Sequence, residues 1–263
     1  MKNIAVLIDF TDGSKTALVQ AIAVAKKAKS KLSGIHIVSS QDKVKQAEAD
    51  LDDFLKTNAP DSEITPVVGI GGLNAATNSA LQKTQADLVF ICTHGIKGMF
   101  QQLFGAHILK LVQAINCPCL VISEHTKVDL SQTQTILFPI GPHPDYMVKV
   151  KQTASLAKIL GASLIIYMID RDGADANQIL NKNIELAESY FTEQQIPFTK
   201  VIEELQHFSA GFSRQTMEYA IRNRIPLMSL MATVSDNDAL YGYVDKENFL
   251  VNNQGVSILT CNH

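Results

Sequence analysis

The sequence predicts an α/β protein made of two tandem five-stranded parallel-sheet units. Short apolar, β-rich runs alternate with helical patterns along the 263 residues, as expected for parallel strands with helices on both faces. A polar stretch at 125–134 interrupts this series, which then restarts. The segment that begins at Ala25, AKKAKSKLSGIHIV, is matched by AKILGASLIIYMID at Ala157, 132 positions later. Two copies of one unit therefore explain the length.

The first unit is expected to contain five strands and four helices. Leu18, Ile22 and Ala25 recur at helical spacing after the turn-and-cap cluster FTDGS. Pro66 indicates an edge position or a distorted start for the third strand, because proline cannot donate a ladder hydrogen bond. In chain order the expected elements are strand 3–9, helix 14–30, strand 31–38, helix 42–57, strand 63–69, helix 73–85, strand 87–93, helix 107–115 and strand 119–123.

The second unit repeats this order with a small drift. The 132-residue offset maps Ile4 onto Ile136 and Ile8 onto Ile140. The amphipathic helix that carries Leu51 is echoed by AESYF at 187–191, and CLVIS is echoed by VSILTC near the end of the chain. We therefore expect a first domain at 1–126, a linker at 127–134 and a degenerate second domain at 135–263.

Charge and hydropathy exclude several classes of protein. The net charge is −3 and the pI is about 6.2, so no basic field indicates nucleic-acid binding. No apolar run reaches the roughly 18–20 residues that cross a bilayer. The first residues lack the cleavage region of a signal peptide and read as a strand. A cytoplasmic protein without membrane or nucleic-acid partners is expected.

Four cysteines are present: Cys92, Cys117, Cys119 and Cys261. The pair in NCPCLVIS could be a metal or redox pair, or two small apolar residues at the start of a buried strand. A zinc site needs four ligands at suitable spacing, and no second pair accompanies this one. The buried-strand interpretation is favoured, and no metal is expected.

Two strand ends are candidates for ligand binding, because open parallel sheets bind ligands beyond the carboxyl ends of their strands. The first strand ends at Asp9, whose carboxylate can only accept hydrogen bonds. The fourth runs into THGIKG, and a helix follows Gly105. A glycine loop before a helix start offers N–H groups and the positive end of the helix dipole to a phosphate. Ala106 and His107 supply the first of these N–H groups.

The arrangement resembles the universal stress protein family. The resemblance lies in the opening strand that ends at Asp9, THG after the fourth strand, the nine residues IKGMFQQLF, then Gly105 and a helix that leads to NCPCLVIS. It covers the whole chain as two copies and is clearer in the first. It implies a Rossmann-like fold of the adenine-nucleotide alpha hydrolase type, ATP with Mg²⁺ as the usual ligand, and a role in the stress response.

The resemblance also implies a set of nucleotide-binding residues in the first unit. Asp9 would hold the adenine side, Val38 would line the base pocket, and Gly95 and Gly105 would approach the phosphates. The full candidate set is Leu7, Ile8, Asp9, Val38, Cys92, Thr93, His94, Gly95, Gly98, Gly105, Ala106 and His107.

Two positions depart from the family pattern. Cys92 stands where its first glycine belongs, and Ala106 replaces a serine or threonine. One lost hydrogen bond to a charged phosphate is worth roughly 1.5–3 kcal/mol. Two readings stay open: a regulatory protein that binds an adenine nucleotide in its first unit alone, and an interaction module that binds none.

The second unit has lost the phosphate loop. At the 132-residue offset Asp9 becomes Gly141, and Gly242 has no glycine partner at the required spacing. Asp236, Asp238, Tyr241 and Tyr243 read as a polar surface loop or as a different site.

No nucleophile–base motif appears, so no enzyme is expected. The resemblance implies an intramolecular pseudo-dimer through Cys119–Ser123 and Ser257–Cys261, and a homodimer of chains is also open.

Overall fold

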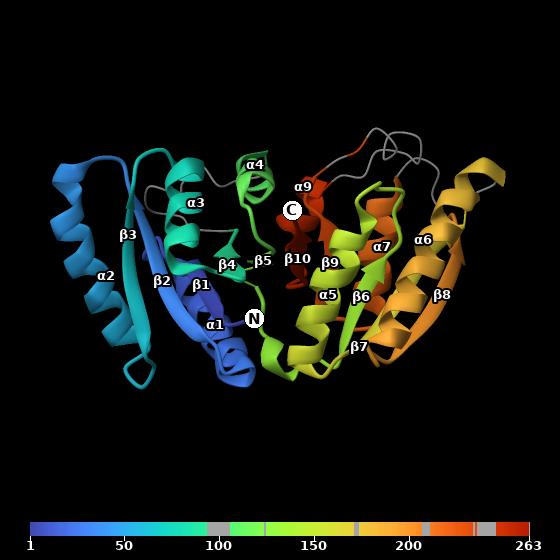
Figure 1. Ribbon diagram of the computed structural model, residues 1–263, viewed down its shortest axis with the longest axis horizontal. Coiled ribbons are helices and arrows are strands. Elements are labelled where there is room, and N and C mark those ends of the chain that lie inside the picture. Colours follow the sequence, from blue (N-terminus) through green and yellow to red (C-terminus); the bar gives the residue numbers. More distant parts are fainter. Residues whose placement is uncertain are drawn as a thin grey trace.

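The computed structural model describes residues 1–93, 106–123, 125–170, 174–206, 211–233, 235 and 246–262. Strands and helices alternate along both halves of the chain, as predicted (Figure 1). The elements of the first half are β1 (Asn3–Leu7), α1 (Asp12–Ala28), β2 (Lys31–Val38), η1 (Gln41–Lys43), α2 (Val44–Asn58), β3 (Ile64–Ile70), α3 (Leu73–Thr84), β4 (Leu88–Cys92), α4 (Ala106–Ala114) and β5 (Cys119–Ile122).

The second half repeats the same order after a short 3₁₀ helix, η2. Its elements are β6 (Thr135–Pro139), α5 (Tyr146–Leu160), β7 (Ser163–Asp170), α6 (Ala174–Glu193), β8 (Phe198–Glu204), α7 (Gly211–Arg222), β9 (Leu227–Met231), α9 (Lys246–Leu250) and β10 (Ser257–Cys261), with η2 at Leu130–Gln132. The predicted α/β fold with two tandem Rossmann-like units is confirmed.

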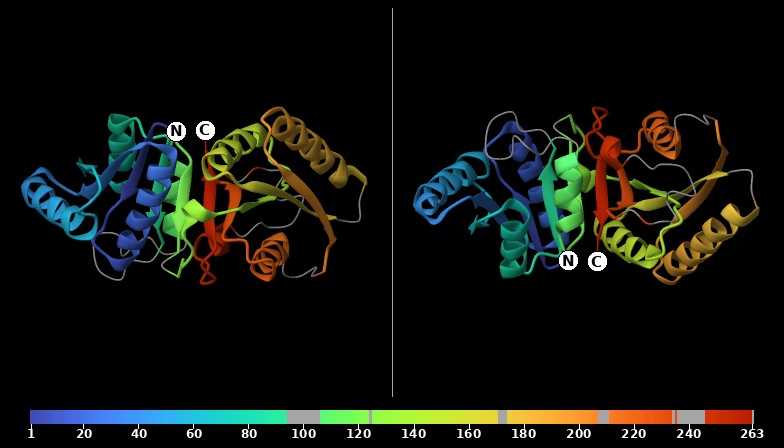
Figure 2. Two further views of the ribbon diagram at one scale, coloured as in Figure 1. Left: turned by 90° about the horizontal axis from the view of Figure 1, so that it is seen from below. Right: turned by 90° about the horizontal axis from the view of Figure 1, so that it is seen from above.

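The described strands form one sheet in the order β3-β2-β1-β4-β5-β10-β9-β6-β7-β8. Pairing is parallel within each half, whereas β5 and β10 pair antiparallel, with Leu120 opposite Leu259. The two halves therefore meet edge to edge at the middle of the molecule (Figures 1 and 2). Pro66 lies in β3, which is an edge strand as predicted.

The repeat has a constant offset over its first two strands and the end of the helix between them. Asn3 and Thr135 begin β1 and β6, and Lys31 and Ser163 begin β2 and β7, each pair 132 positions apart. The same offset relates the two helix C-caps, Lys29 and Gly161, which both have left-handed backbone conformations. Later elements drift: β3 and β8 begin 134 positions apart, and β4 and β9 begin 139 positions apart.

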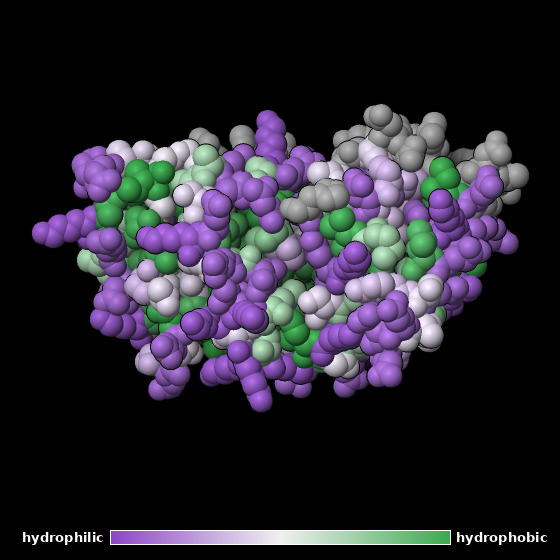
Figure 3. Space-filling view, in the orientation of Figure 1, coloured by the Kyte–Doolittle hydropathy of each residue, from purple (hydrophilic) through white to green (hydrophobic). Residues whose placement is uncertain are grey.

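Helices cover both faces of the sheet (Figure 2). Side chains alternate across each strand, so Ile4, Val6 and Ile8 pack under α1 and α2, while Ala5 and Leu7 face α3 and α4. The second half divides in the same way, with α5 and α6 on one face and α7 and α9 on the other. Hydrophilic residues are spread over both halves of the face seen in Figure 3.

A glutamine on α1 binds the segment between the halves. The Gln20 amide donates to Val128 O (3.0 Å) and accepts from the Leu130 N–H (2.8 Å). The side chain of Leu130 is fully buried. This stretch, which the sequence presents as polar, is therefore packed against α1.

A lysine on α1 ties the same segment to the second half. Lys27 Nζ donates to Ser131 O (2.6 Å) and to Leu160 O at the end of α5 (2.7 Å).

In the described part of the chain, no helix combines the length and apolarity needed to cross a membrane.

Candidate functional site

The first half has a topological switch point between β1 and β4. β1 pairs with β2 on one side and with β4 on the other. The chain leaves β1 toward β2 and β3, then returns on the opposite side as β4. Open α/β sheets bind ligands beyond the strand ends at such a point. Asp9 and Thr93 follow these two strands.

The Asp9 carboxylate is oriented by the turn that follows it. Its Oδ1 accepts from the Thr11 N–H (3.1 Å) and from the Thr11 hydroxyl (2.5 Å). Thr11 in turn caps α1, because its Oγ1 accepts from the Ser14 N–H (3.2 Å). The other oxygen, Asp9 Oδ2, accepts no hydrogen bond from a described residue. The carboxylate is thus held by one oxygen and can accept a donor through the second.

The residues expected on the base side are buried and held by the backbone. Leu7, Ile8 and Val38 are all buried. The Ile8 carbonyl lies 2.8 Å from His36 Nδ1, which must carry the proton because a carbonyl only accepts. The Val38 carbonyl accepts from the Gly71 N–H (2.9 Å). These bonds fix the ends of β1 and β2 as an apolar boundary near Asp9.

Phe10 is a feature of this loop that sequence reasoning missed. It is not glycine, yet its φ is 65°, a conformation that bulky residues rarely adopt. Its ring lies 4.5 Å from the His36 ring and 5.6 Å from the Phe54 ring, centroid to centroid. Backbone strain of this kind often marks ligand sites. The sequence signal was weak: an aromatic residue between Asp9 and Thr11.

The structure of the end of β4 shows where the Cys92 side chain lies. Cys92 is half-buried and packs against the core cluster on the α1 side of the sheet. Thr93 is buried, and its N–H donates to Ile122 O (3.1 Å), which extends the pairing with β5 by one residue. The Cys92 side chain therefore contributes to the core beneath α1.

Part of the candidate set lies outside the described residues: His94, Gly95, Gly98 and Gly105. Ala106 and His107 are the first two residues of α4. Helix α4 thus begins where the sequence indicates a phosphate contact. The first N–H groups of a helix have no partner within it.

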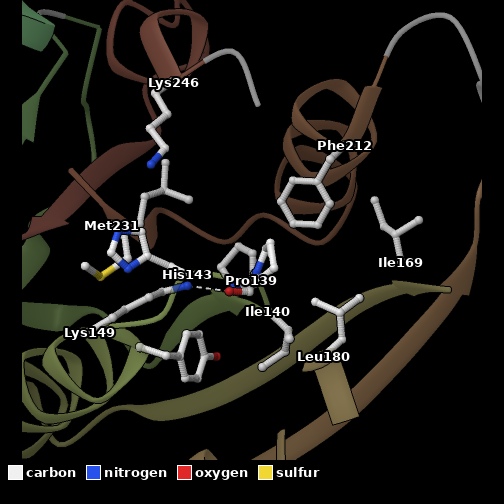
Figure 4. Close-up of a pocket in the computed structure, with 13 residues that line it drawn as sticks. Pro139, Ile140, His143, Lys149, Ile169, Leu180, Phe212, Met231 and Lys246 are labelled. Carbon is white, nitrogen blue, oxygen red and sulfur yellow. Dashed lines mark hydrogen bonds between the residues drawn. The ribbon is translucent and has the colours of Figure 1, made fainter. Parts of the chain in front are cut away.

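The second half has its own switch point, between β6 and β9, and a pocket lies there (Figure 4). Pro139 ends β6, and the loop that begins at Ile140 lines the pocket together with Leu230 and Met231 of β9. Gly141 occupies the position of Asp9, as the repeat predicts, and a Cβ atom added there would meet no atom within 4 Å.

Two buried lysines line this pocket, and sequence reasoning missed both. Lys149 of α5 donates to the Pro139 carbonyl, and Lys246 of α9 donates to the Thr233 carbonyl. A signal for Lys149 existed: it lies on the buried face of α5 between Tyr146 and Thr153. Lys246 offered none, because its helix has only five residues.

The cysteine pair lies at the start of β5. Cys119 is buried in the strand, and burial raises the pKa of its thiol well above the usual range. Burial, with a smaller contribution from Asp87, raises the pKa of the Cys117 thiol to about 12. Both thiols stay protonated near neutral pH, whereas redox chemistry and metal binding use the thiolate. The described residues contain no cluster of three or more metal-binding side chains.

Comparison with known proteins identifies the first half. Residues 1–123 match the model of the universal stress protein family. No curated protein matches the sequence.

Solved structures share the fold over the whole chain at low identity. A universal stress protein from Archaeoglobus fulgidus DSM 4304 is 12% identical, with a TM-score of 0.70 over 99% of this chain and 96% of its own. A putative universal stress protein from Pseudomonas aeruginosa UCBPP-PA14 is 15% identical, with a TM-score of 0.61 over 100% and 93%.

The fold also occurs outside stress proteins. The cytoplasmic domain of a prokaryotic cation chloride cotransporter is 10% identical, with a TM-score of 0.53 over 99% of this chain and 95% of its own. At such identities the likeness shows the fold alone. The universal stress protein family model matches residues 1–123, slightly less than half of the chain, and the solved structures show that the whole chain shares a two-unit fold with proteins of that name.

Proposed function

We propose that this protein is a non-catalytic regulator of the stress response that binds an adenine nucleotide in its first half. The observation that carries the proposal is the Asp9 carboxylate, held by Thr11 at the switch point between β1 and β4. It lies in the half that matches the family model.

The described residues fit such a ligand in three respects. Asp9 Oδ2 can accept from an amine or hydroxyl of the nucleoside. Leu7, Ile8 and Val38 give an apolar boundary for the base. The N-terminus of α4, at Ala106, presents N–H groups and a positive dipole to phosphate. A Mg²⁺ ion bound with the phosphates would neutralise part of their charge.

We further propose that the second half acts as a built-in partner. If the second half is a built-in partner, the chain divides into a domain at 1–126, a linker at 127–134 and a domain at 135–263. Antiparallel pairing of β5 with β10 supports it, because each half completes its sheet edge with the other. A homodimer of whole chains would then use surfaces other than β5.

Calorimetry with Mg-ATP tests the nucleotide proposal. We expect Asp9→Asn to weaken binding about tenfold or more, because it keeps the shape and removes the charge of the acceptor. Asp12→Asn is the matched control, since Asp12 is exposed three positions away in the first turn of α1. Equal effects of the two variants would contradict a specific role for Asp9.

The alternative is an interaction module that binds no nucleotide. Ala106 favours it, because this residue offers no hydroxyl to a phosphate. A ligand selective for the folded state must raise the unfolding temperature. If Mg-ATP at saturating excess leaves the midpoint of the unmodified protein unchanged, the module reading stands and the nucleotide proposal fails.

A further inference from the structure

The second half contains a pocket that is lined mostly by buried apolar side chains. We propose that this pocket, between β6, β9, α6 and α7, binds an uncharged apolar molecule about the size of one aromatic ring. The proposal makes no use of nucleotide binding in the first half, so each of the two sites can be tested without the other.

The pocket lies at the switch point of the second half. β6 pairs with β7 on one side and with β9 on the other, so the loops that follow these strands diverge beyond the end of β6. Open parallel sheets bind ligands at such a point. Asn183 of α6 is buried, and its Nδ2 donates to the Gly141 carbonyl (2.7 Å). The loop after β6 is therefore anchored to a helix of the core.

Apolar side chains from four elements line the pocket (Figure 4). Phe212 comes from α7, Ile169 from β7 and Leu180 from α6, and their side chains point toward the same space. Leu230 and Met231 of β9 also line the pocket. All of these except Phe212 are between 3% and 6% exposed and belong to the hydrophobic core. Such walls remove the apolar surface of a ligand from water and add dispersion contacts.

The basic side chains of the lining already have partners within the protein. Lys149 donates to the Pro139 carbonyl, and its ammonium lies 4.4 Å from the centroid of the Phe138 ring. Lys246 donates to the Thr233 carbonyl. An uncharged apolar ligand leaves these contacts intact, whereas a carboxylate would compete for the ammonium groups and would also have to leave water.

The other hydrogen-bonding groups of the lining are engaged in the same way. His143 Nδ1 accepts from the Asp145 N–H (3.1 Å), so the proton is on Nε2, which donates to the Thr233 hydroxyl 3.0 Å away. The Gly141 carbonyl accepts from Asn183. A ligand therefore does not have to supply hydrogen bonds to these groups, and a molecule without polar atoms is accepted.

The size of the cavity limits the ligand. The volume open to the centre of a water molecule is about 60 Å³. One water needs roughly 10–15 Å³ on this measure, so the space is that of about four to six waters. Apolar cavities stay dry and take up small molecules such as benzene. Protein interiors contain few voids larger than one water, so a hollow of this size among core residues indicates a ligand.

The residue change between the two halves agrees with an apolar ligand. Asp9 of the first half corresponds to Gly141, and a Cβ atom added to Gly141 would meet no atom within 4 Å. A carboxylate at this position would need hydrogen-bond donors, which an apolar molecule does not have. Glycine removes that requirement at the edge of the pocket.

Methyl NMR of the whole protein tests the site, with toluene as the probe. We expect toluene to shift the methyl signals of Ile169, Leu180 and Met231, which line the pocket, and to leave those of Ile4 and Val6 in the first half unchanged. Benzoate replaces the methyl group of toluene with a carboxylate and should bind about tenfold more weakly or worse. Equal affinity for benzoate would overturn the neutral ligand, and no shift at the solubility limit of toluene would overturn the site.

Leu180 and Leu186 provide a matched pair of variants on α6. Leu180 lines the pocket, whereas Leu186 is 38% exposed and is not part of the lining. Leu180→Phe should weaken toluene binding about tenfold or more, because the larger side chain fills the cavity, and Leu186→Phe should change it by about twofold at most. Equal effects of the two variants would contradict binding in this cavity.

A series of ligands on the unmodified protein tests the same cavity if Leu180→Phe does not fold. We expect benzene and toluene to bind, and 1,3,5-triethylbenzene, which is nearly twice as large, to bind about tenfold more weakly or worse. An apolar patch on the surface would instead bind the larger hydrocarbon more tightly, because more apolar area is buried. That order of affinities would refute the cavity as the site.

Mg-ATP distinguishes this site from the nucleotide site of the first half. If Mg-ATP shifted the methyl signals of Ile169 and Leu180, or displaced toluene, the nucleotide would occupy this pocket and the proposal would fail. Toluene shifts that persist in Asp9→Asn, whether or not the unmodified protein binds ATP, would support an independent site.

Discussion

At the switch point between β1 and β4 the loop carries Asp9 and Thr11, whereas 132 positions later the corresponding loop carries Gly141 and His143. The backbone plan is the same, since β1 and β6 have matching lengths and neighbours. The chemistry is opposite: a carboxylate in one half and two buried lysines in the other. Strand ends can diverge in this way because the fold does not need their side chains.

The two halves also differ in the helix that follows each loop. Lys149 of α5 corresponds to Ala17 of α1 at the same offset, and both are buried. Space for a long side chain therefore exists in the second half, where the lysine lines a pocket, and is filled in the first, where the alanine packs in the core.

A lysine placed at position 17 tests whether the first half can hold the side chain that the second half accommodates. Ala17→Lys should destabilise the protein by about 4 kcal/mol, because it overpacks the core and buries a charge. Urea denaturation measures the change. Val19→Lys is the control on the same helix, since Val19 is 51% exposed, and it should shift the free energy of unfolding by about 0.5 kcal/mol at most. A small effect at Ala17 would mean that the first half also contains a hollow there.

An intermediate effect concerns two glutamines that are 132 positions apart. Gln20 binds the segment between the halves, and Gln152 binds Asn262 after β10, accepting from its N–H at 3.1 Å and donating to its carbonyl. Gln20→Ala should cost about 2 kcal/mol, because it leaves the buried Leu130 N–H and the part-buried Val128 carbonyl unpaired. Gln152→Ala should cost about 1 kcal/mol, since Gln152 is only half-buried.

Urea denaturation of both glutamine variants measures this difference. Gln46→Ala, on the exposed surface of α2, is the control and should change stability by about 0.5 kcal/mol at most. If Gln152→Ala proved the more costly, the packing of the chain after β10 would matter more than the contact with the linker.

The C-caps of α1 and α5 differ in residue type but share one backbone conformation. Lys29 and Gly161 both adopt left-handed C-cap conformations, with φ of 53° and 62°. Lys29→Gly should stabilise the protein by up to about 1 kcal/mol, because glycine has no Cβ penalty there. Gly161→Ala should cost about 1 kcal/mol from backbone strain alone, since nothing lies within 4 Å of the added carbon. Thermal unfolding resolves both, and equal signs would contradict the argument.

The spacing of apolar residues was enough to predict the fold, because the residues that a helix or strand buries on one side recur at its period. Ala47, Leu51 and Leu55 recur on one side of a helix, and all three are buried in α2. Their counterparts Ala187 and Phe191 are buried in α6, as the match of LDDFL with AESYF predicts. Such positions can be found in a sequence, since each needs only a neighbour one turn away.

The lysine pocket could not be predicted in the same way. Lys149 and Lys246 are 97 positions apart and share a site only after α5 and α9 have packed on the sheet. A lysine is also read as a surface residue by default, because it is almost never fully buried. Asp9 was easier to find, since a strand end followed by a turn and a cap places it in any parallel sheet.

The antiparallel junction of β5 with β10 has a consequence for how the two halves can diverge in evolution. A tethered partner is always present at high effective concentration, so the second copy does not have to compete for its place. One copy can lose a feature while its neighbour keeps it, and the stoichiometry stays one to one. An assembly of identical subunits has no such freedom, because every substitution appears twice.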